Sequence, residues 1–246
     1  MVTRVAVVGA SGKMGQLFCR LIEESDDFEV SAELTSQDSL DAMNGADLVV
    51  DVTSPAVSAQ VVAHALDQGI RVLVGTSGWS ADRIATLRTR LADGDIGVVI
   101  VPNFSLGSVL GTTLATIASR FFDSIEIIEG HRASKVDSPS GTAVRTAELI
   151  GEARAGLGPV VAPHVDQRAR GQQVSSIPIH SLRLDGIVAR QEVIFGGAGE
   201  TLTITHNTLD PSSYEQGILL ALDAARSATG LTVGLENIMD LGIHRS

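Results

Sequence analysis

The chain has 246 residues, of which 44% are apolar and 19% are charged, and its net charge at pH 7 is −11. This length suffices for one large domain or two modest ones, and the composition is that of a globular α/β protein. The acidic charge argues against a surface for nucleic acid or an anionic membrane, because such surfaces need clustered cations.

The sequence carries no signal for export or membrane insertion. No basic-then-apolar leader opens it, and no run approaches the roughly 20 apolar residues of a membrane span. The single cysteine, Cys19, can form no internal disulfide and is predicted to be a buried structural thiol. We therefore expect a soluble, cytoplasmic protein.

A glycine-rich loop follows the first predicted strand. The apolar run 4–9 leads into GASGKMG at 9–15, and helical spacing follows over 16–24. Gly9 would allow the tight turn, Gly12 would let the backbone approach a pyrophosphate, and Gly15 would let the helix pack on the strand. A tight turn without a ligand is the alternative. The predicted cofactor contacts of this loop are Gly9, Ala10, Ser11, Gly12, Lys13 and Met14.

Strands and helices then alternate, which predicts a Rossmann-like, doubly wound parallel sheet. The predicted strands are 29–34, 47–52, 71–75 and 97–101, and the helices between them are 54–68 and 81–92. Three strand ends are rich in small polar residues and should share the edge where such sheets bind ligands, unless they are ordinary turns and helix caps. The residues predicted to line this edge include Thr53, Gly75, Thr76, Ser77, Pro102, Asn103 and Phe104.

The end of the second strand bears on the choice of cofactor. An acid there normally binds the adenosine ribose of NAD. Glu33 is one candidate, but alternation puts Thr35 on the same face and nearer the strand end. If Thr35 holds that place, no carboxylate repels a 2′-phosphate, and Lys13 can pair with it. This pattern favours NADPH, or the use of both NADPH and NADH.

The second half of the chain changes pattern and predicts a second, α+β domain with an antiparallel or mixed sheet. Its predicted helices are 107–122 and 144–155, and its strands are 125–128, 177–184, 190–195 and 200–205. A helix at 213–227 and a closing segment at 231–243 follow. We assign residues 1–104, completed by 213–246, to the dinucleotide-binding domain and 105–212 to the substrate domain. Within a long loop at 156–173, Arg168 and Arg170 either close over an anion or belong to a solvated surface.

The stretch 129–143, EGHRASKVDSPSGTA, gathers the reactive groups of this second domain. Only Lys13 and Lys135 are lysine among eighteen basic residues, which suggests that a compact, titratable ammonium is needed at these two places. We expect His131 and Lys135 to share one ligand, with Lys135 as general acid. Asp137 either caps the following helix or holds Lys135. Structural roles for these residues are the alternative, and the role of His206 is left open.

A nucleotide loop in one domain and a His/Lys pair in the other suggest hydride transfer to an anionic acceptor, such as a dicarboxylate. The residues also resemble the dihydrodipicolinate reductase (4-hydroxy-tetrahydrodipicolinate reductase) family along nearly the whole chain. The most specific match is KVDSPSGTA at 135–143, beside the family's KxDxPSGTA. Further matches are the loop 9–15, the strand ends at 51–53, 75–78 and 102–105, and, downstream, Arg183, 192–195 and 199–206.

The resemblance implies an NADPH- or NADH-dependent reductase of lysine and diaminopimelate biosynthesis that forms tetrahydrodipicolinate. It implies that His131 is the proton donor or acceptor, that Lys135 is the proton donor, and that Gly141 and Thr142 bind the substrate carboxylate beside Ser140. It further implies nicotinamide-side contacts at Gly75, Thr76 and Ser77 and at Val101, Pro102, Asn103 and Phe104. It also implies a homotetramer that assembles through the second domain. No metal is expected.

Three positions depart from the family pattern. Arg132 stands where a second histidine is usual, and it can bind a carboxylate bidentately but does not titrate. Ser77 replaces a threonine, and Thr35 replaces the ribose-binding acid. Two other functions stay open: an NADP-dependent imine reductase acting on another cyclic acid, and a catalytically silent sensor of pyridine nucleotides.

Overall fold

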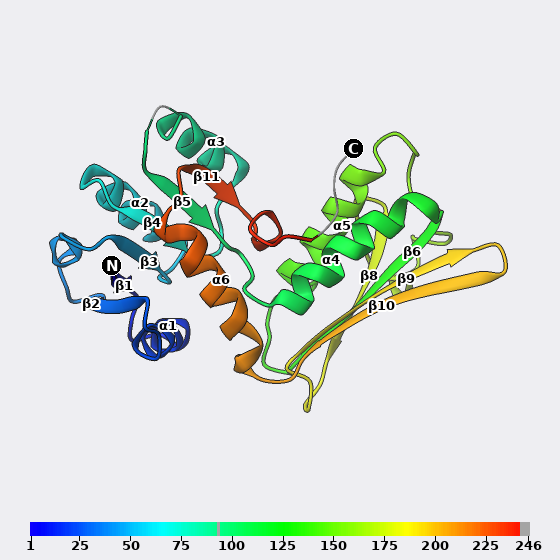
Figure 1. Cartoon of the computed structure of the whole chain (residues 1–246). Coiled ribbons are helices and arrows are strands. Elements are labelled where there is room, and N and C mark those ends of the chain that lie inside the picture. Colours follow the sequence, from blue (N-terminus) through cyan, green and yellow to red (C-terminus); the bar gives the residue numbers. More distant parts are fainter. Residues whose placement is uncertain (93, 242–246) are drawn as a thin grey trace. The chain divides into compact units, whose positions relative to one another are not determined.

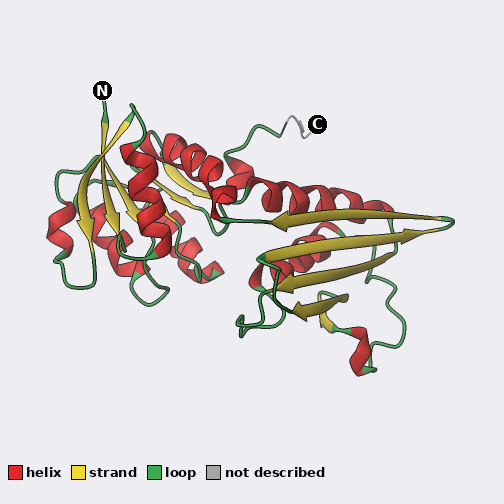
Figure 2. Ribbon diagram, turned by 90° about the horizontal axis from the view of Figure 1, so that it is seen from below, coloured by secondary structure: helices red, strands yellow, loops and turns green. Residues whose placement is uncertain are grey.

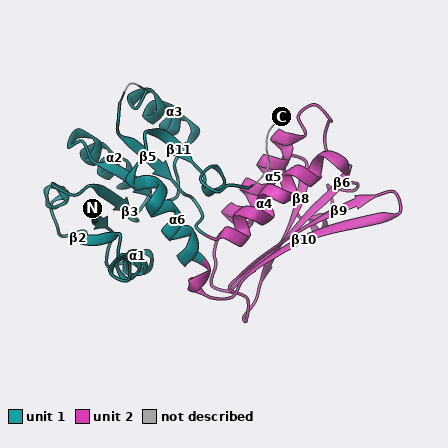
Figure 3. Ribbon diagram, in the orientation of Figure 1, with its two compact units in different colours: residues 1–104, 214–246 teal, residues 105–213 magenta. Residues whose placement is uncertain are grey.

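The computed structural model describes residues 1–92 and 94–241 (Figure 1). The chain divides into two compact units, which Figure 3 distinguishes by colour: residues 1–104 with the segment from 214 onward, and residues 105–213. Each unit contains one sheet. The predicted closing segment 231–243 reaches into 242–246, which lie outside the described residues. No described helix is long and apolar enough to cross a membrane.

The first unit contains a six-stranded sheet in which every pairing is parallel, in the order β11-β5-β4-β3-β1-β2. Its strands are β1 (Thr3–Val8), β2 (Phe28–Leu34), β3 (Leu48–Asp51), β4 (Arg71–Val74), β5 (Gly97–Ile100) and β11 (Gly230–Val233). The direction of winding reverses at β1, whose neighbours are β2 on one side and β3 on the other. This confirms the predicted Rossmann-like sheet, to which the end of the chain adds a sixth strand.

Helices cover both faces of this sheet: α1 (Lys13–Glu23), α2 (Ser58–Asp67), α3 (Ala81–Arg90) and α6 (Glu215–Arg226). Ala6 and Val8 lie in the same core as residues of α2 and α3, whereas Val5 and Val7 are fully buried on the opposite face. Burial on both faces explains why these strands are continuous apolar runs rather than alternating ones. Cys19 is buried and free, as predicted.

The second unit contains a five-stranded sheet in the order β10-β9-β6-β8-β7. Its strands are β6 (Ser124–His131), β7 (Gln172–Val174), β8 (Ile177–Arg183), β9 (Ala189–Gly197) and β10 (Glu200–Thr208). The β6–β8 pair is parallel and the other pairs are antiparallel, which confirms a mixed sheet. Helices α4 (Leu106–Ala118) and α5 (Gly141–Ala153) pack on one face (Figures 1 and 2).

Two element boundaries near the reactive stretch differ from the prediction. Strand β6 runs on to His131 rather than ending at 128, because Gly130 and His131 pair with Leu182 and Arg183 of β8. Helix α5 begins at Gly141 rather than 144, because the Ser140 hydroxyl accepts a hydrogen bond from the amide of the third helical residue. The reactive stretch is therefore partly strand and partly the first helical turn.

Candidate active site

The end of β6 places a carboxylate beside the predicted catalytic histidine. Glu129 and His131 are two residues apart on one strand, so both side chains point to the same face of the sheet. His131 Nδ1 lies 2.6 Å from Glu129 Oε2, and the Glu129 side chain is only 1% exposed. An ionised carboxylate can only accept, so Nδ1 carries the shared proton and Nε2 is the nitrogen available to a ligand.

Arg183 completes this cluster from the neighbouring strand. Its Nη1 and Nη2 donate to the two oxygens of Glu129 at 3.0 and 2.8 Å, a bidentate pair. Burial alone would raise the pKa of Glu129, but hydrogen bonds from Arg183, Ser181 and His131 outweigh it and hold the pKa below its usual value. The carboxylate is therefore charged at neutral pH.

Sequence reasoning assigned no role to Glu129 and found Arg183 only as part of a resemblance. Alternation along β6 is the signal that could have identified Glu129, since an acid two residues before a histidine on a strand shares its face. The contact with Arg183 depends on the pairing of β6 with β8, which no local pattern shows.

Lys135 lies in the turn between β6 and α5, and its backbone amide donates to the Arg132 carbonyl at 3.1 Å. Its ammonium lies 2.8 Å from Asp137 Oδ1 and holds the pKa of that carboxyl below its usual value. Of the two roles considered for Asp137, the structure shows it holding Lys135, while Ser140 caps the helix. The neighbour of the ammonium is therefore a carboxylate, one of the two arrangements that the sequence left open.

The first turn of α5 is the other predicted part of this site. Ser140 is buried and its hydroxyl accepts from the Ala143 amide at 3.3 Å, while its own amide donates to Glu129 Oε1 at 3.3 Å. Gly141 and Thr142 are exposed, and apart from Gly141 itself, its chain neighbours and the nearby helix backbone, no described atom lies within 4 Å of where a Cβ on Gly141 would stand. Arg132 is also exposed. An open helix N-terminus with a free approach suits a carboxylate.

The glycine loop of the first unit fits a dinucleotide. Gly9 has a φ of +92°, and a Cβ there would lie 2.6 Å from the Val52 carbonyl oxygen. A Cβ on Gly15 would lie 2.2 Å from the Gly9 carbonyl oxygen, so the helix can approach the strand only at a glycine. Gly12 is the N-cap of α1 and supplies no side-chain acceptor, so the first amides of this helix can face a phosphate. Ser11 and Lys13 are exposed, Met14 is half-buried and Ala10 is buried.

The carboxyl ends of β3, β4 and β5 lie along the same edge. The Thr53 hydroxyl donates to Asp51 Oδ1 at 2.5 Å, and the Thr76 hydroxyl donates to the Asp51 carbonyl at 3.3 Å. A Cβ on Gly75 would lie 2.9 Å from the Phe104 ring, so the ends of β4 and β5 pack through this glycine. The remaining predicted contacts are Ser77 and Pro102, which are exposed, Asn103, which is half-buried, and Val101, which is buried.

A second carboxylate that sequence reasoning missed lies at the end of β2. Thr35 is the first residue beyond this strand, and both its amide and its hydroxyl donate to Oδ2 of Asp38, at 2.8 and 2.7 Å. The position that seemed to lack an acid therefore has one fixed beside it. An acid three residues after a threonine is a common turn pattern, so the sequence held only a weak signal.

The structure also shows the surroundings of the residues of the second unit whose roles the sequence left open. Arg170 donates to Glu126 and to the Pro163 carbonyl, so it anchors its loop, whereas Arg168 is exposed. His206 is 3.3 Å from the Ser105 hydroxyl and half-buried, and its burial lowers its pKa.

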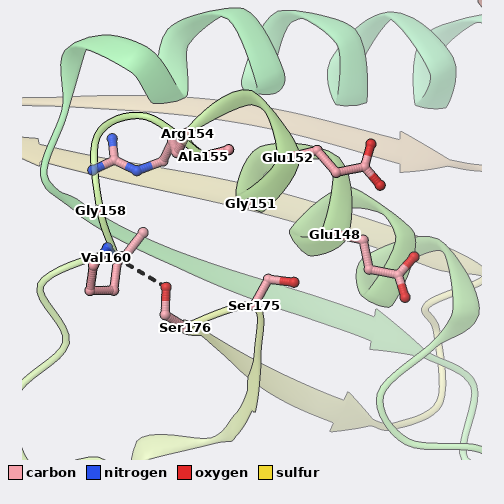
Figure 4. Close-up of a pocket in the computed structure, with 10 residues that line it drawn as sticks. Glu148, Gly151, Glu152, Arg154, Ala155, Gly158, Val160, Ser175 and Ser176 are labelled. Carbon is pink, nitrogen blue, oxygen red and sulfur yellow. Dashed lines mark hydrogen bonds between the residues drawn. The ribbon is translucent and has the colours of Figure 1, made fainter.

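A cavity beside the last turns of α5, shown in Figure 4, has a volume of about 570 Å³ and contains none of the predicted site residues. Among the described residues, no group of three His, Cys, Asp or Glu side chains could hold a metal ion.

Comparisons with known proteins agree along the whole chain. Residues 3–104 match the model of the dihydrodipicolinate reductase N-terminus, and residues 107–239 match that of its C-terminus. The 4-hydroxy-tetrahydrodipicolinate reductase of Clavibacter michiganensis subsp. michiganensis is 62% identical over 98% of this chain and 87% of its own length. The reductase of the same name from Streptomyces griseus is 45% identical over 97% of this chain and 98% of its own.

A solved structure supports the same conclusion. Dipicolinate-bound dihydrodipicolinate reductase from Paenisporosarcina sp. TG-14 is 29% identical, with a TM-score of 0.84 over 97% of this chain and 100% of that one. The relatives therefore match both parts of this chain: the part with the glycine loop and the part with the His131/Lys135 stretch. The chain belongs to the dihydrodipicolinate reductase family and is an NAD(P)H-dependent oxidoreductase.

Proposed function

We propose that this chain reduces 4-hydroxy-tetrahydrodipicolinate, by way of dihydrodipicolinate, to tetrahydrodipicolinate. The observation that carries the proposal is the buried Glu129 carboxylate that orients His131. Lys135 follows in the loop after β6, and this loop leads into the open N-terminus of α5. The names of the relatives agree with it. The solved relative with bound dipicolinate indicates that a planar dicarboxylate is the right class of ligand.

In this proposal the substrate lies against the first turn of α5. The amides of Gly141 and Thr142 and the positive end of the helix dipole bind one carboxylate. Arg132 is exposed beside this turn and can bind a carboxylate with two parallel hydrogen bonds. These contacts orient the ring and do not change during the reaction, so their loss should weaken substrate binding first.

The proton chemistry belongs to His131 and Lys135. The reduction adds one hydride and one proton to the conjugated imine, after water has been lost from the 4-hydroxy compound. Lys135 delivers the proton, because an ammonium is a general acid and contact with Asp137 Oδ1 at 2.8 Å holds this one in place. His131, oriented by Glu129, presents Nε2 to donate or accept a proton at the ring.

The cofactor would be held by the first unit. The dihydronicotinamide, when bound, supplies the hydride. The amides at the start of α1 would hold the pyrophosphate, while Thr53, Thr76 and Phe104 line the edge where the nicotinamide end belongs. The assignment of 1–104 with 213–246 to the cofactor and of 105–212 to the substrate follows from this division.

We also propose a homotetramer assembled through the second sheet. Helices α4 and α5 cover only one face of this sheet (Figure 2). The other face presents Leu182, which is 44% exposed, together with the half-buried Ile128 and Ile194. An open sheet face with apolar side chains is a natural interface between subunits. Sedimentation of the purified chain should give four times the chain mass, and a monomer at micromolar concentration would contradict this.

The test of function follows the absorbance of NADH and NADPH with freshly generated dihydrodipicolinate synthase product. Oxidation of either nucleotide that depends on this product supports the reaction. A second cuvette with another cyclic imine acid separates this reaction from that of a related imine reductase. Nucleotide binding without any oxidation would overturn the proposal and favour a nucleotide sensor.

A further inference from the structure

The guanidinium of Arg183 contacts more than the Glu129 carboxylate. Among the described residues, Arg183 donates four hydrogen bonds, all from its two terminal nitrogens. Two of them go to Glu129, at 3.0 and 2.8 Å, and two go to the carbonyls of Leu182 and Asp137, both at 2.6 Å. Asp137 belongs to the loop that joins β6 to α5, so Arg183 ties this loop to the sheet.

The carboxylate of the same ion pair holds two more points of the reactive stretch. Glu129 Oε1 accepts a hydrogen bond from the Ser140 amide at 3.3 Å, and Oε2 lies 2.6 Å from His131 Nδ1. The Glu129 side chain is 1% exposed and that of Arg183 is 18% exposed, so salt and solvent screen these contacts little. The pair therefore fixes the strand end at His131, the middle of the loop at Asp137 and the start of α5 at Ser140.

The loop itself has few other contacts that would fix Lys135. Residues 132–140 contain no helix or strand, and the one hydrogen bond described between two of their backbone groups joins the Lys135 amide to the Arg132 carbonyl. The Lys135 ammonium lies 2.8 Å from Asp137 Oδ1, but the Asp137 side chain is 60% exposed, and an exposed ion pair holds little by itself. The backbone of Asp137 therefore decides where the ammonium lies, and Arg183 holds that backbone.

The open face of the sheet contains a second arginine with the same kind of contacts. Arg170 donates to both oxygens of Glu126 and to the Pro163 carbonyl, so it also ties a loop to β6. The loop that it holds, within 156–171, carries neither of the predicted proton carriers. Arg170 thus provides a matched comparison for Arg183.

We propose that Arg183 is a positioning residue for proton transfer, which holds the loop of Lys135 at a fixed place relative to His131. The inference rests on the proposed reaction and names a residue that acts in it only through others: the Glu129 carboxylate and the Asp137 carbonyl. A guanidinium suits this task because parallel donors engage the carboxylate while its other hydrogens reach carbonyls. An ammonium has three donors on a single atom and cannot make all four bonds.

The first test is Arg183→Lys, which keeps the charge and loses the geometry. Its kcat with dihydrodipicolinate should fall about 10–10²-fold, since misplacing reacting groups by about 1 Å can cost a hundredfold. Its Kd for the nucleotide, measured by calorimetry, should stay within about twofold, because the nucleotide belongs to the first unit. Arg170→Lys is the matched control, and its kcat should stay within about twofold. Circular dichroism shows that both variants are folded.

Chemical rescue separates positioning from a general contribution to stability. Arg183→Ala should lose at least about a hundredfold in kcat, and guanidinium chloride at about 50 mM, far below denaturing concentrations, should restore at least about tenfold of it. Ammonium chloride at the same concentration should not, because it supplies no parallel donors. Neither salt should rescue His131→Gln, since that variant lacks the proton carrier itself.

Three kinetic outcomes would overturn the proposal. The first is a kcat of Arg183→Lys within twofold of the wild type, which is the result that a merely structural role gives in a folded variant. The second is an equal loss of kcat in Arg183→Lys and Arg170→Lys. The third is rescue of Arg183→Ala by ammonium as effective as that by guanidinium.

Amide hydrogen exchange without substrate separates this inference from the proposed reaction. Arg183→Lys should quicken exchange of the Lys135 and Ser140 amides about tenfold, whereas Arg170→Lys should leave them unchanged. A wild type that oxidises neither nucleotide with dihydrodipicolinate overturns the reaction, and exchange still decides whether Arg183 holds the loop. Unchanged exchange in Arg183→Lys overturns the role of Arg183 whatever the activity.

Discussion

The second sheet contains two clusters of the same three residue types on its opposite faces. One joins Glu129, His131 and Arg183, and the other joins Glu126, His180 and Arg170. Glu129 and Glu126 are three residues apart on β6, so their side chains point to opposite faces. In each cluster the carboxylate bonds to a histidine nitrogen, at 2.6 and 2.7 Å, and to an arginine.

The two clusters differ in how deeply their glutamates are buried. The Glu129 side chain is 1% exposed on the face that carries α4 and α5, whereas that of Glu126 is 30% exposed on the open face. Burial alone would raise the pKa of Glu126 too, and Arg170 and His180 outweigh it in the same way. The same chemistry thus orients a histidine beside a helix N-terminus on one face and anchors a loop on the other.

The largest expected difference concerns the two histidines. His131→Gln should lower kcat by about 10²–10⁴, the usual loss when a positioned acid or base is removed. His180→Gln, the matched change on the open face, should leave kcat within about twofold. Steady-state kinetics with NADH and dihydrodipicolinate measure both. Equal losses would show that the open face also takes part in catalysis.

The two carboxylates should differ in stability. Glu129→Gln leaves Arg183, whose side chain is 18% exposed, without its counter-charge beside a buried position and should cost about 3–5 kcal/mol of unfolding free energy. Glu126→Gln breaks a partly exposed pair and should cost about 1 kcal/mol or less. Urea unfolding at pH 7 gives both values. Similar costs for the two variants would mean that burial does not set the strength of these clusters.

Glu126 and Glu129 also predict that the free energy of unfolding falls at acid pH. The pKa of each glutamate is lowered by folding, so its contribution is complete above the unfolded value of about 4.3 and is lost as the pH falls through the folded value. Between pH 5 and 3 the wild type should therefore lose stability. Unfolding at several pH values should show a flatter acid limb for Glu129→Gln than for the wild type, and a smaller change for Glu126→Gln.

The smallest effect is expected from the loop anchor. Arg170→Ala removes the contacts of this loop with Glu126 and with the Pro163 carbonyl. Amide hydrogen exchange around 163–170 should quicken while kcat stays within about twofold. Unchanged exchange would show that other contacts hold the loop.

The sequence by itself determined the features that depend on local geometry. The glycines of the 9–15 loop could be assigned because a positive φ and close backbone approach leave no room for a Cβ at Gly9 and Gly15. The alternation of buried strands and helices predicted the first sheet for the same local reason. His131 and Lys135 could be proposed as site residues because their stretch is rich in reactive groups.

Tertiary structure decided which groups surround those residues. Arg183 and His180 each lie 54 positions beyond their glutamate, and only the register of β6 with β8 brings them together. That pairing also extends β6 to His131, which a local pattern ending at 128 did not show. Glu126 and Glu129 are the same residue type, so the sequence alone does not distinguish their roles. Only packing against α4 and α5 makes one a buried partner of His131 and leaves the other on an open face, since burial depends on contacts distant in the chain.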